Sequence, residues 1–379
     1  MAVVGATTGY GLAWLIVLLL PMLAIVQAIA ASVAGASQMS LQQAIVRTYG
    51  RFPAVVALVC VVGIGLFTLI ADVAAGAQAL TLLTGIPYPY FVVPFVGAVA
   101  VLLATTSYVK IERTLAFVTL IFLCYVASAV LAHPDWREVL TGILIPRFPL
   151  TPEFLTGAIA LLGTTLTGYV YYWESIEIAE RRPERSALKA VTTDAALGML
   201  VAGSSFLFIL VATAATSGKH HLAIRTAADA AAALQPLAGS LDQALFGIGL
   251  LASAAIAVPV IAATGGYVVA QTFERRASLT LRPKEAPFFY AVIFASLGLA
   301  AILALLPFPT MELLYWSSVA AGLATPVTLA LTMLVARNWT AMRGTPIGIP
   351  LVCAGWAVTA LVTLASVGFL SATLSLRTF

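Results

Sequence analysis

Ten long apolar segments dominate this chain, and all nineteen of its lysine and arginine residues lie outside those segments. A helix needs about 20 apolar residues to cross a bilayer, whereas the strands of a membrane barrel show roughly ten-residue alternation. The segments have the helical length. Charged residues make up 9% of the chain, against about 25% in soluble domains. The sequence therefore predicts an all-α integral membrane protein with spans at residues 12–34, 53–83, 90–106, 115–131, 153–178, 195–215, 241–272, 288–306, 313–336 and 349–370.

The positions of the basic residues predict how the chain is oriented, because lysine and arginine collect in cytoplasmic loops. Fourteen of the nineteen lie in the loops that follow the first, third, fifth, seventh and ninth spans. We therefore expect those loops to be cytoplasmic in a multi-pass protein of the plasma membrane or bacterial inner membrane. This location accounts for the net charge of +4, so no nucleic-acid partner is expected. No nucleotide-binding glycine loop, catalytic triad or redox motif stands out, and we expect no enzymatic activity.

The fifth predicted span, residues 153–178, contains a cluster of glycines and threonines where a buried helix should be most regular. Gly163 and Gly168 predict a break in this helix. Irregular backbone survives at membrane depth only around a cavity or a bound ligand, and secondary transporters hold substrates and coupling ions at such breaks. Thr164 and Thr167 would offer hydroxyl oxygens there, which hard cations prefer. The alternative is that these threonines bond to their own helix and only bend it.

Three acidic residues lie at plausible membrane depth: Asp72, Glu174 and Glu177. Such residues are functional candidates by default, because a charge within a span costs a few kcal/mol. Asp72 shares a helix face with small residues, so it should face the bundle and carry a proton or a cation. The alternative is a purely structural hydrogen bond. Glu174 and Glu177 would continue one stripe from Thr167, although Glu177 is also spaced to pair with Arg181.

Several stretches carry distinctive patterns in chain order: residues 5–14, 71–73, 163–174, 227–239 and 245–260. Residues 163–169 read Gly-Thr-Thr-Leu-Thr-Gly-Tyr. These stretches resemble the Nramp family of divalent-metal transporters, whose bacterial branch has Gly-Thr-Thr-Ile-Ser-Pro-Tyr in its sixth helix. The resemblance covers nearly the whole chain.

The resemblance implies a LeuT-type fold, in which two inverted five-helix repeats surround a central site and one extra helix follows. The whole chain, 1–379, would form a single transmembrane domain. Residues 1–10 would be a remnant of family helix one, 11–152 the rest of the first repeat, 153–345 the second repeat and 346–379 the extra helix. The resemblance also implies a monomer that takes up manganese, iron or a related divalent cation together with protons, with no other cofactor.

Thr164, Thr167 and Glu174 would then be the metal ligands, and Asp72, Glu174 and Glu177 would couple protons. The chain departs from the family at several of these positions. Gly168 replaces a proline, Thr167 occupies the position of a methionine used by many members, and Glu174 that of a histidine. Oxygen ligands alone should favour manganese or magnesium over softer metals.

The metal-binding aspartate of family helix one would fall upstream of Met1, so we expect the chain to lack the first half of that helix. Two alternatives therefore remain beside a proton-coupled divalent-cation transporter. One is a transporter of the same architecture for another small solute, such as an amino acid. The other is a truncated or non-transporting homologue that binds a partner.

Overall fold

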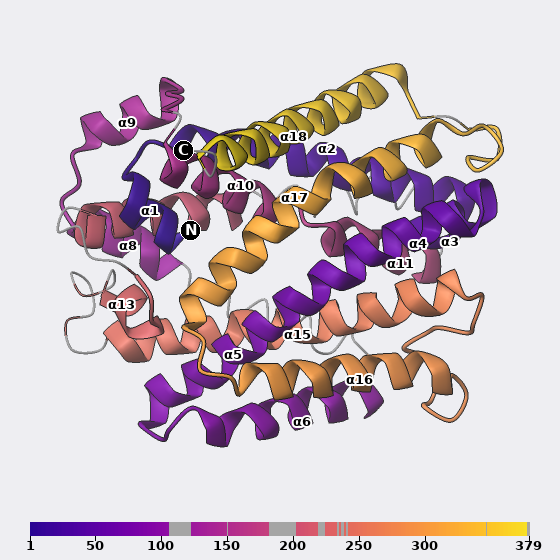
Figure 1. Ribbon diagram of the computed structural model, residues 1–379, viewed down its shortest axis with the longest axis horizontal. Coiled ribbons are helices and arrows are strands. Elements are labelled where there is room, and N and C mark those ends of the chain that lie inside the picture. Colours follow the sequence, from indigo (N-terminus) through magenta and orange to yellow (C-terminus); the bar gives the residue numbers. More distant parts are fainter. Residues whose placement is uncertain are drawn as a thin grey trace.

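The structure is a computed structural model that describes residues 1–105, 123–149, 151–181, 202–218, 224–232, 235, 239, 242–345 and 347–376. Within these ranges, every regular element is a helix. The long helices lie side by side along one direction, with shorter helices at the two ends of the bundle (Figure 1). The helices are α1 (Ala2–Thr8), α2 (Ala13–Ser37), α3 (Leu41–Tyr49), α4 (Arg51–Leu58), η1 (Val59–Gly63), α5 (Ile64–Thr84), α6 (Pro89–Thr105), α8 (Leu123–Leu131), α9 (Trp136–Leu144), α10 (Pro152–Thr165), α11 (Gly168–Arg181), Ala202–Gly218, α13 (Ala227–Ala231), α15 (Asp242–Thr272), α16 (Pro287–Ala304), α17 (Thr310–Arg337) and α18 (Ile349–Leu376).

The predicted membrane spans agree closely with these helices. Among the described residues, 7 helical stretches are long and apolar enough to cross a membrane, and each corresponds to a predicted span. The span predicted at 90–106 is the shorter helix α6, and the one at 195–215 corresponds to the helix Ala202–Gly218. Much of the span predicted at 115–131 lies outside the described residues. The total of ten spans therefore stays a prediction.

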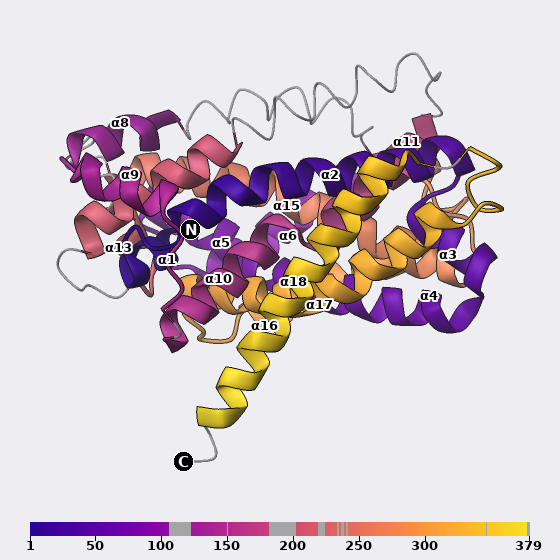
Figure 2. The same cartoon turned by 90° about the horizontal axis from the view of Figure 1, so that it is seen from above.

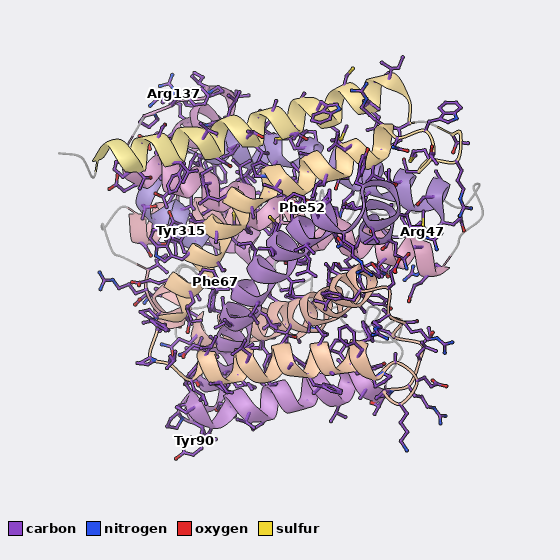
Figure 3. The ribbon with its side chains drawn as sticks, turned by 45° about the vertical axis from the view of Figure 1, so that its right-hand side comes forward. Arg47, Phe52, Phe67, Tyr90, Arg137 and Tyr315 are labelled. Carbon is purple, nitrogen blue, oxygen red and sulfur yellow. The ribbon has the colours of Figure 1, made fainter. Side chains whose placement is uncertain are left out.

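The basic loops that the structure describes lie at the two ends of the bundle, as expected for a membrane protein. Arg47, from a loop predicted to be cytoplasmic, and Arg137, from a loop predicted to be external, lie at opposite margins of the molecule (Figure 3). Short helices outside the spans close the two ends. At the N-terminus of α3, Ser40 forms a capping box with Gln43, in which each side chain bonds to the backbone N–H of the other residue.

Two glycines allow α10 and α17 to pack with almost no space between their backbones. A Cβ atom added to Gly163 would lie 1.9 Å from the carbonyl oxygen of Ser318, and one added to Gly322 would lie 2.4 Å from that of Ile159. Small residues at such crossings are how membrane helices approach closely. The sequence predicted that Gly163 belongs to the helix break, but the structure places it inside α10, where its role is this close contact.

We predict that Gly163→Ala destabilises the protein, because the new methyl group would collide with backbone atoms that cannot move aside. Overpacking of this kind costs about 1–3 kcal/mol or more. Gly97→Ala is the matched control, since Gly97 lies in α6 with open space around it. Thermal unfolding of the purified protein in detergent should give a melting temperature several degrees lower for Gly163→Ala only. Equal stability of the two variants would contradict this packing.

Candidate functional site

The fifth predicted span is broken into two helices, α10 and α11. Leu166 and Thr167 are the residues between them, and Leu166 has φ −104° and ψ 25°, outside the helical range. Gly168, expected in the break, is the first residue of α11. A helix end leaves carbonyl groups without partners in the next turn, and these need other donors when they are buried.

Thr325 of α17 supplies one such donor. Its hydroxyl oxygen lies 3.2 Å from the carbonyl oxygen of Leu166 and 2.8 Å from that of Ala321, so its single proton is shared between the two. Thr325 is 1% exposed, which means that water cannot replace it. The neighbouring helix therefore satisfies a carbonyl that the break sets free.

A cavity of about 410 Å³ lies against this break. Its walls come from α1, α5, α10, the start of α11, the helix Ala202–Gly218, α15 and α17. The residues of α15 and α17 that line it belong to the first half of each helix. The cavity thus extends from the middle of the bundle towards the end at which α15 and α17 begin.

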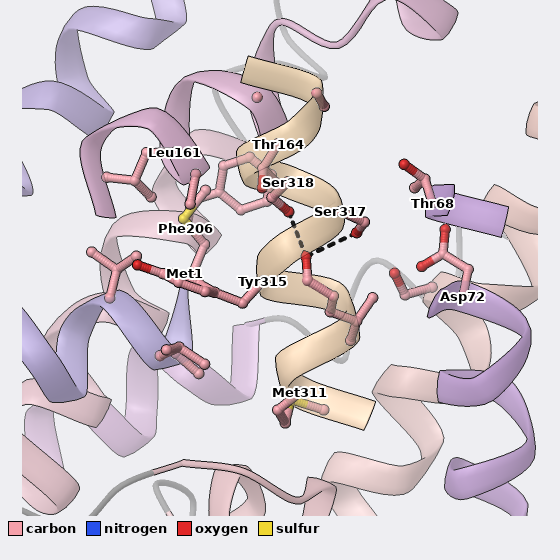
Figure 4. Close-up of a pocket in the computed structure, with 18 of the residues that line it drawn as sticks. Met1, Thr68, Asp72, Leu161, Thr164, Phe206, Met311, Tyr315, Ser317 and Ser318 are labelled. Atoms are coloured by element: carbon pink, nitrogen blue, oxygen red, sulfur yellow. Dashed lines mark hydrogen bonds between the residues drawn. The ribbon is translucent and has the colours of Figure 1, made fainter. Parts of the chain in front are cut away.

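One acidic side chain and a set of hydroxyl groups line this cavity. Asp72 is the only acidic residue among the described lining residues, and Thr68 precedes it by one helical turn of α5. Figure 4 shows these two side chains together, across the cavity from Ser317 and Ser318 of α17. The hydroxyls of Ser317 and Ser318 donate to the carbonyl oxygen of Leu314, at 3.0 Å and 2.7 Å, which leaves their lone pairs free to accept or to bind a cation.

The structure brings together some of the predicted site residues. Asp72, Gly163, Thr164 and Thr167 all line the cavity. The hydroxyl of Thr165, between the last two, is buried without a hydrogen-bond partner and does not line it. Of these three threonines, Thr164 and Thr167 therefore line the cavity, and their role as metal ligands stays a prediction.

Glu174 and Glu177 lie elsewhere. Both are on α11 and neither lines the cavity. Glu177 accepts a hydrogen bond from Arg181 at 2.9 Å, the i, i+4 ion pair that the sequence offered as its alternative role. Their proposed parts in metal binding and proton coupling are therefore separate from the cavity.

Sequence reasoning missed several polar residues of the cavity. Thr68 could have been found, because it is four residues before Asp72 on the same helix face. Ser317 and Ser318 form the one serine pair in the predicted span 313–336, which was a usable signal. Met311 and Ser253 also line the cavity, but nothing in their local sequence sets them apart.

The cavity has the chemistry of a hard-cation site of modest strength. A carboxylate and several hydroxyls are oxygen ligands, which suit magnesium, calcium and manganese. The described residues contain no cluster of three or more histidine, cysteine, aspartate or glutamate side chains that could hold a metal tightly. The thioethers of Met1 and Met311 are the softest groups on the described wall.

Comparison with known proteins identifies the family. Residues 1–372 match the family model described as natural resistance-associated macrophage protein-like, or Nramp. The chain belongs to the Nramp family. It is 33% identical to the divalent metal cation transporter MntH of Xylella fastidiosa over 293 residues, which are 74% of this chain and 61% of that protein. The chain therefore spans less than two thirds of the length of that Nramp relative.

Solved structures show the Nramp fold directly. The manganese transporter of Eremococcus coleocola superposes with a TM-score of 0.73 at 21% identity, covering 97% of this chain and 83% of that one. Mhp1, a nucleobase-cation-symport-1 family transporter in a closed conformation, superposes with a TM-score of 0.53 at 16% identity, covering 99% and 83%. The LeuT-type fold implied by the sequence is therefore confirmed.

At the opposite end of the helix bundle of this Nramp protein, buried hydrogen bonds link α3 to α11 and α15. The hydroxyl of Ser40 donates to Oε1 of Gln271 at 2.6 Å, and the backbone N–H of Leu41 donates to the hydroxyl oxygen of Ser175 at 3.0 Å. These four residues are at most 8% exposed. They join the start of α3 to α11 and to the end of α15.

We predict that Thr325→Val loosens the helix break, because it leaves the buried Leu166 carbonyl without its donor. An unsatisfied buried group costs about 1–3 kcal/mol. The control is Thr332→Val, since Thr332 is also 1% exposed and its hydroxyl bonds only within its own helix, to Thr328. Hydrogen exchange of residues 162–170 should speed up in Thr325→Val alone. Unchanged protection there would contradict the role assigned to Thr325.

Proposed function

We propose that this Nramp protein is a secondary transporter of divalent metal cations, with manganese, iron or magnesium as the candidate ions. The observation that supports this most is the shared cavity, in which Asp72 lies with Thr164 and Thr167 of the broken helix. A carboxylate beside the hydroxyls of a helix break is suited to a cation that must bind and leave again. The names of the relatives, a divalent metal cation transporter and a manganese transporter, agree with this chemistry.

In this proposal, Asp72 is the principal metal ligand and Thr167 and Thr164 add oxygen ligands. Asp72 also exchanges protons, because its carboxylate must be unprotonated to hold the cation and a proton can neutralise it once the cation leaves. Glu174 and Glu177 act on the cation or on protons as these move along α11 towards the predicted cytoplasmic side. The protein would work as a monomer in the plasma membrane or bacterial inner membrane.

The proposal of alternating access rests on the difference between the two ends of the helix bundle. By the predicted orientation, the cavity extends towards the external side, and the Ser40–Gln271 and Leu41–Ser175 hydrogen bonds close the cytoplasmic side. Release to the cytoplasm would require these bonds to break.

We predict that Asp72→Asn abolishes cation uptake, because it removes the one carboxylate among the described residues that line the cavity. Manganese affinity should fall about tenfold or more, equivalent to at least about 1.4 kcal/mol. Asp242→Asn is the control, since Asp242 lies at the N-terminus of α15 outside the cavity. Manganese uptake into proteoliposomes, with and without an inward proton gradient, measures both variants.

The wild-type protein and Asp242→Asn should take up manganese faster with the gradient. Uptake by Asp72→Asn at the wild-type rate would refute the assignment of Asp72. No uptake by the wild-type protein in either condition would favour the truncated, non-transporting homologue.

We also predict that Thr167→Met shifts the metal preference towards soft ions, because a thioether replaces a hydroxyl oxygen at the break. Competition for manganese uptake by cadmium and by magnesium measures this preference. Cadmium should become the stronger competitor by roughly tenfold relative to the wild type, in line with about 1.4 kcal/mol per tenfold change. An identical competition profile would mean that Thr167 does not contact the ion.

A further inference from the structure

A second cavity, of about 440 Å³, lies on the membrane-facing side of α10, α17 and α18. It shares no lining residue with the cavity at the helix break. Its described walls carry no charged side chain, and most of the lining residues are apolar. They are Phe67, Pro152, Leu155, Thr156, Trp316, Val319, Ala320, Leu323, Phe369, Ala372 and Thr373.

The divergence of α18 from the bundle creates this groove. The hydroxyl of Ser366 is buried and lies 3.3 Å from the carbonyl oxygen of Gly322, to which it can donate. After this contact, the C-terminal part of α18 projects away from the other helices (Figure 2). The groove lies between this C-terminal part of α18 and the first turns of α10 and α17.

The groove offers a ligand apolar contact without free hydroxyl donors. The hydroxyl of Thr156 donates to the carbonyl oxygen of Pro152 at 2.6 Å, and that of Thr373 to the carbonyl oxygen of Phe369 at 2.7 Å. Both threonine hydroxyls thus donate their hydrogen bonds within their own helices. A polar solute would find no free hydroxyl donor among the described lining residues, and water would find few hydrogen-bond partners in such a cavity.

The surface around the groove indicates what fills it. Trp316 at the groove is 52% exposed, and Leu364 on the outer side of α18 is 73% exposed. Large apolar side chains this exposed on a membrane-spanning helix face lipid. The groove is continuous with this lipid-facing surface, so the hydrocarbon chains of the bilayer are the apolar material in direct contact with it.

We propose that the groove is a lipid-binding site that holds one acyl chain of a membrane phospholipid. The chain would enter between the ends of α10 and α18 and lie along α17, with its methyl end near Gly322. The length of α18 from Ser366 to Thr373 corresponds to about 10 Å at 1.5 Å per residue, which a chain segment can follow. The bound chain would support α17 directly behind its contact with Gly163.

Photocrosslinking tests this proposal. The wild-type protein is placed in nanodiscs of phosphatidylcholine that carries a diazirine on one acyl chain, and the labelled peptides are mapped by mass spectrometry. Labels should concentrate on the groove residues of α10, α17 and α18. Ala320→Trp, which fills the floor of the groove, should reduce this labelling at least severalfold. Leu364→Trp, on the lipid-facing side of α18 outside the groove, should leave it unchanged.

Ala372→Phe provides a second filling variant from α18, in case Ala320→Trp does not fold. Loss of groove labelling in either folded filling variant supports the site. Even labelling over all lipid-facing helices, unaltered by both filling variants, would overturn the proposal, because it would show that only the general lipid shell contacts this surface.

Discussion

A helix can be interrupted inside a membrane only if the backbone groups that it frees find partners, and this requirement organises the molecule. The interruption at Leu166 and Thr167 is stabilised from α17, where the hydroxyl of Thr325 is shared with the Leu166 carbonyl. Such a long-range bond demands that α10 and α17 lie very close together. Gly163 and Gly322 provide that proximity, because any larger side chain would collide with the opposite backbone. The break, its donor and the close crossing therefore form one unit.

The candidate site depends on this unit. Once α10 is held against α17, Thr164 and Thr167 point into the same cavity as Asp72 of α5. Their oxygen atoms and the carboxylate come from helices that are far apart in sequence. The residues of α15 and α17 that line the cavity belong to the first half of each helix, so the cavity reaches only halfway through them. At the opposite end, buried hydrogen bonds join the start of α3 to α11 and α15. This asymmetry is what alternating access requires of one of its states.

Much of this could be predicted from the sequence because membrane insertion imposes simple local rules. Apolar length located the spans that the structure describes. The small residues around Asp72 correctly placed it towards the bundle, where its neighbours Ala75 and Ala79 are buried. Family resemblance added the LeuT-type topology, which no local rule contains.

The residues that the sequence analysis misassigned or missed have roles that are set by tertiary contacts. A glycine in a membrane helix favours both a break and a close crossing, and only the position of Gly322 decides that Gly163 serves the crossing. Thr325, Ser317 and Ser318 acquire their roles from α10 and α5, which are distant in sequence. Glu174 is an acidic residue within a predicted span, yet it lies on α11, where it does not line the cavity.

The most direct test of the account is the position of the bound ion. Crystals of the wild-type protein grown with manganese would give an anomalous difference peak for the metal. We expect that peak within coordination distance of the Asp72 carboxylate and beside Thr167 at the helix break. A peak at Glu174 or Glu177, with none in the cavity, would contradict the assignment of the site.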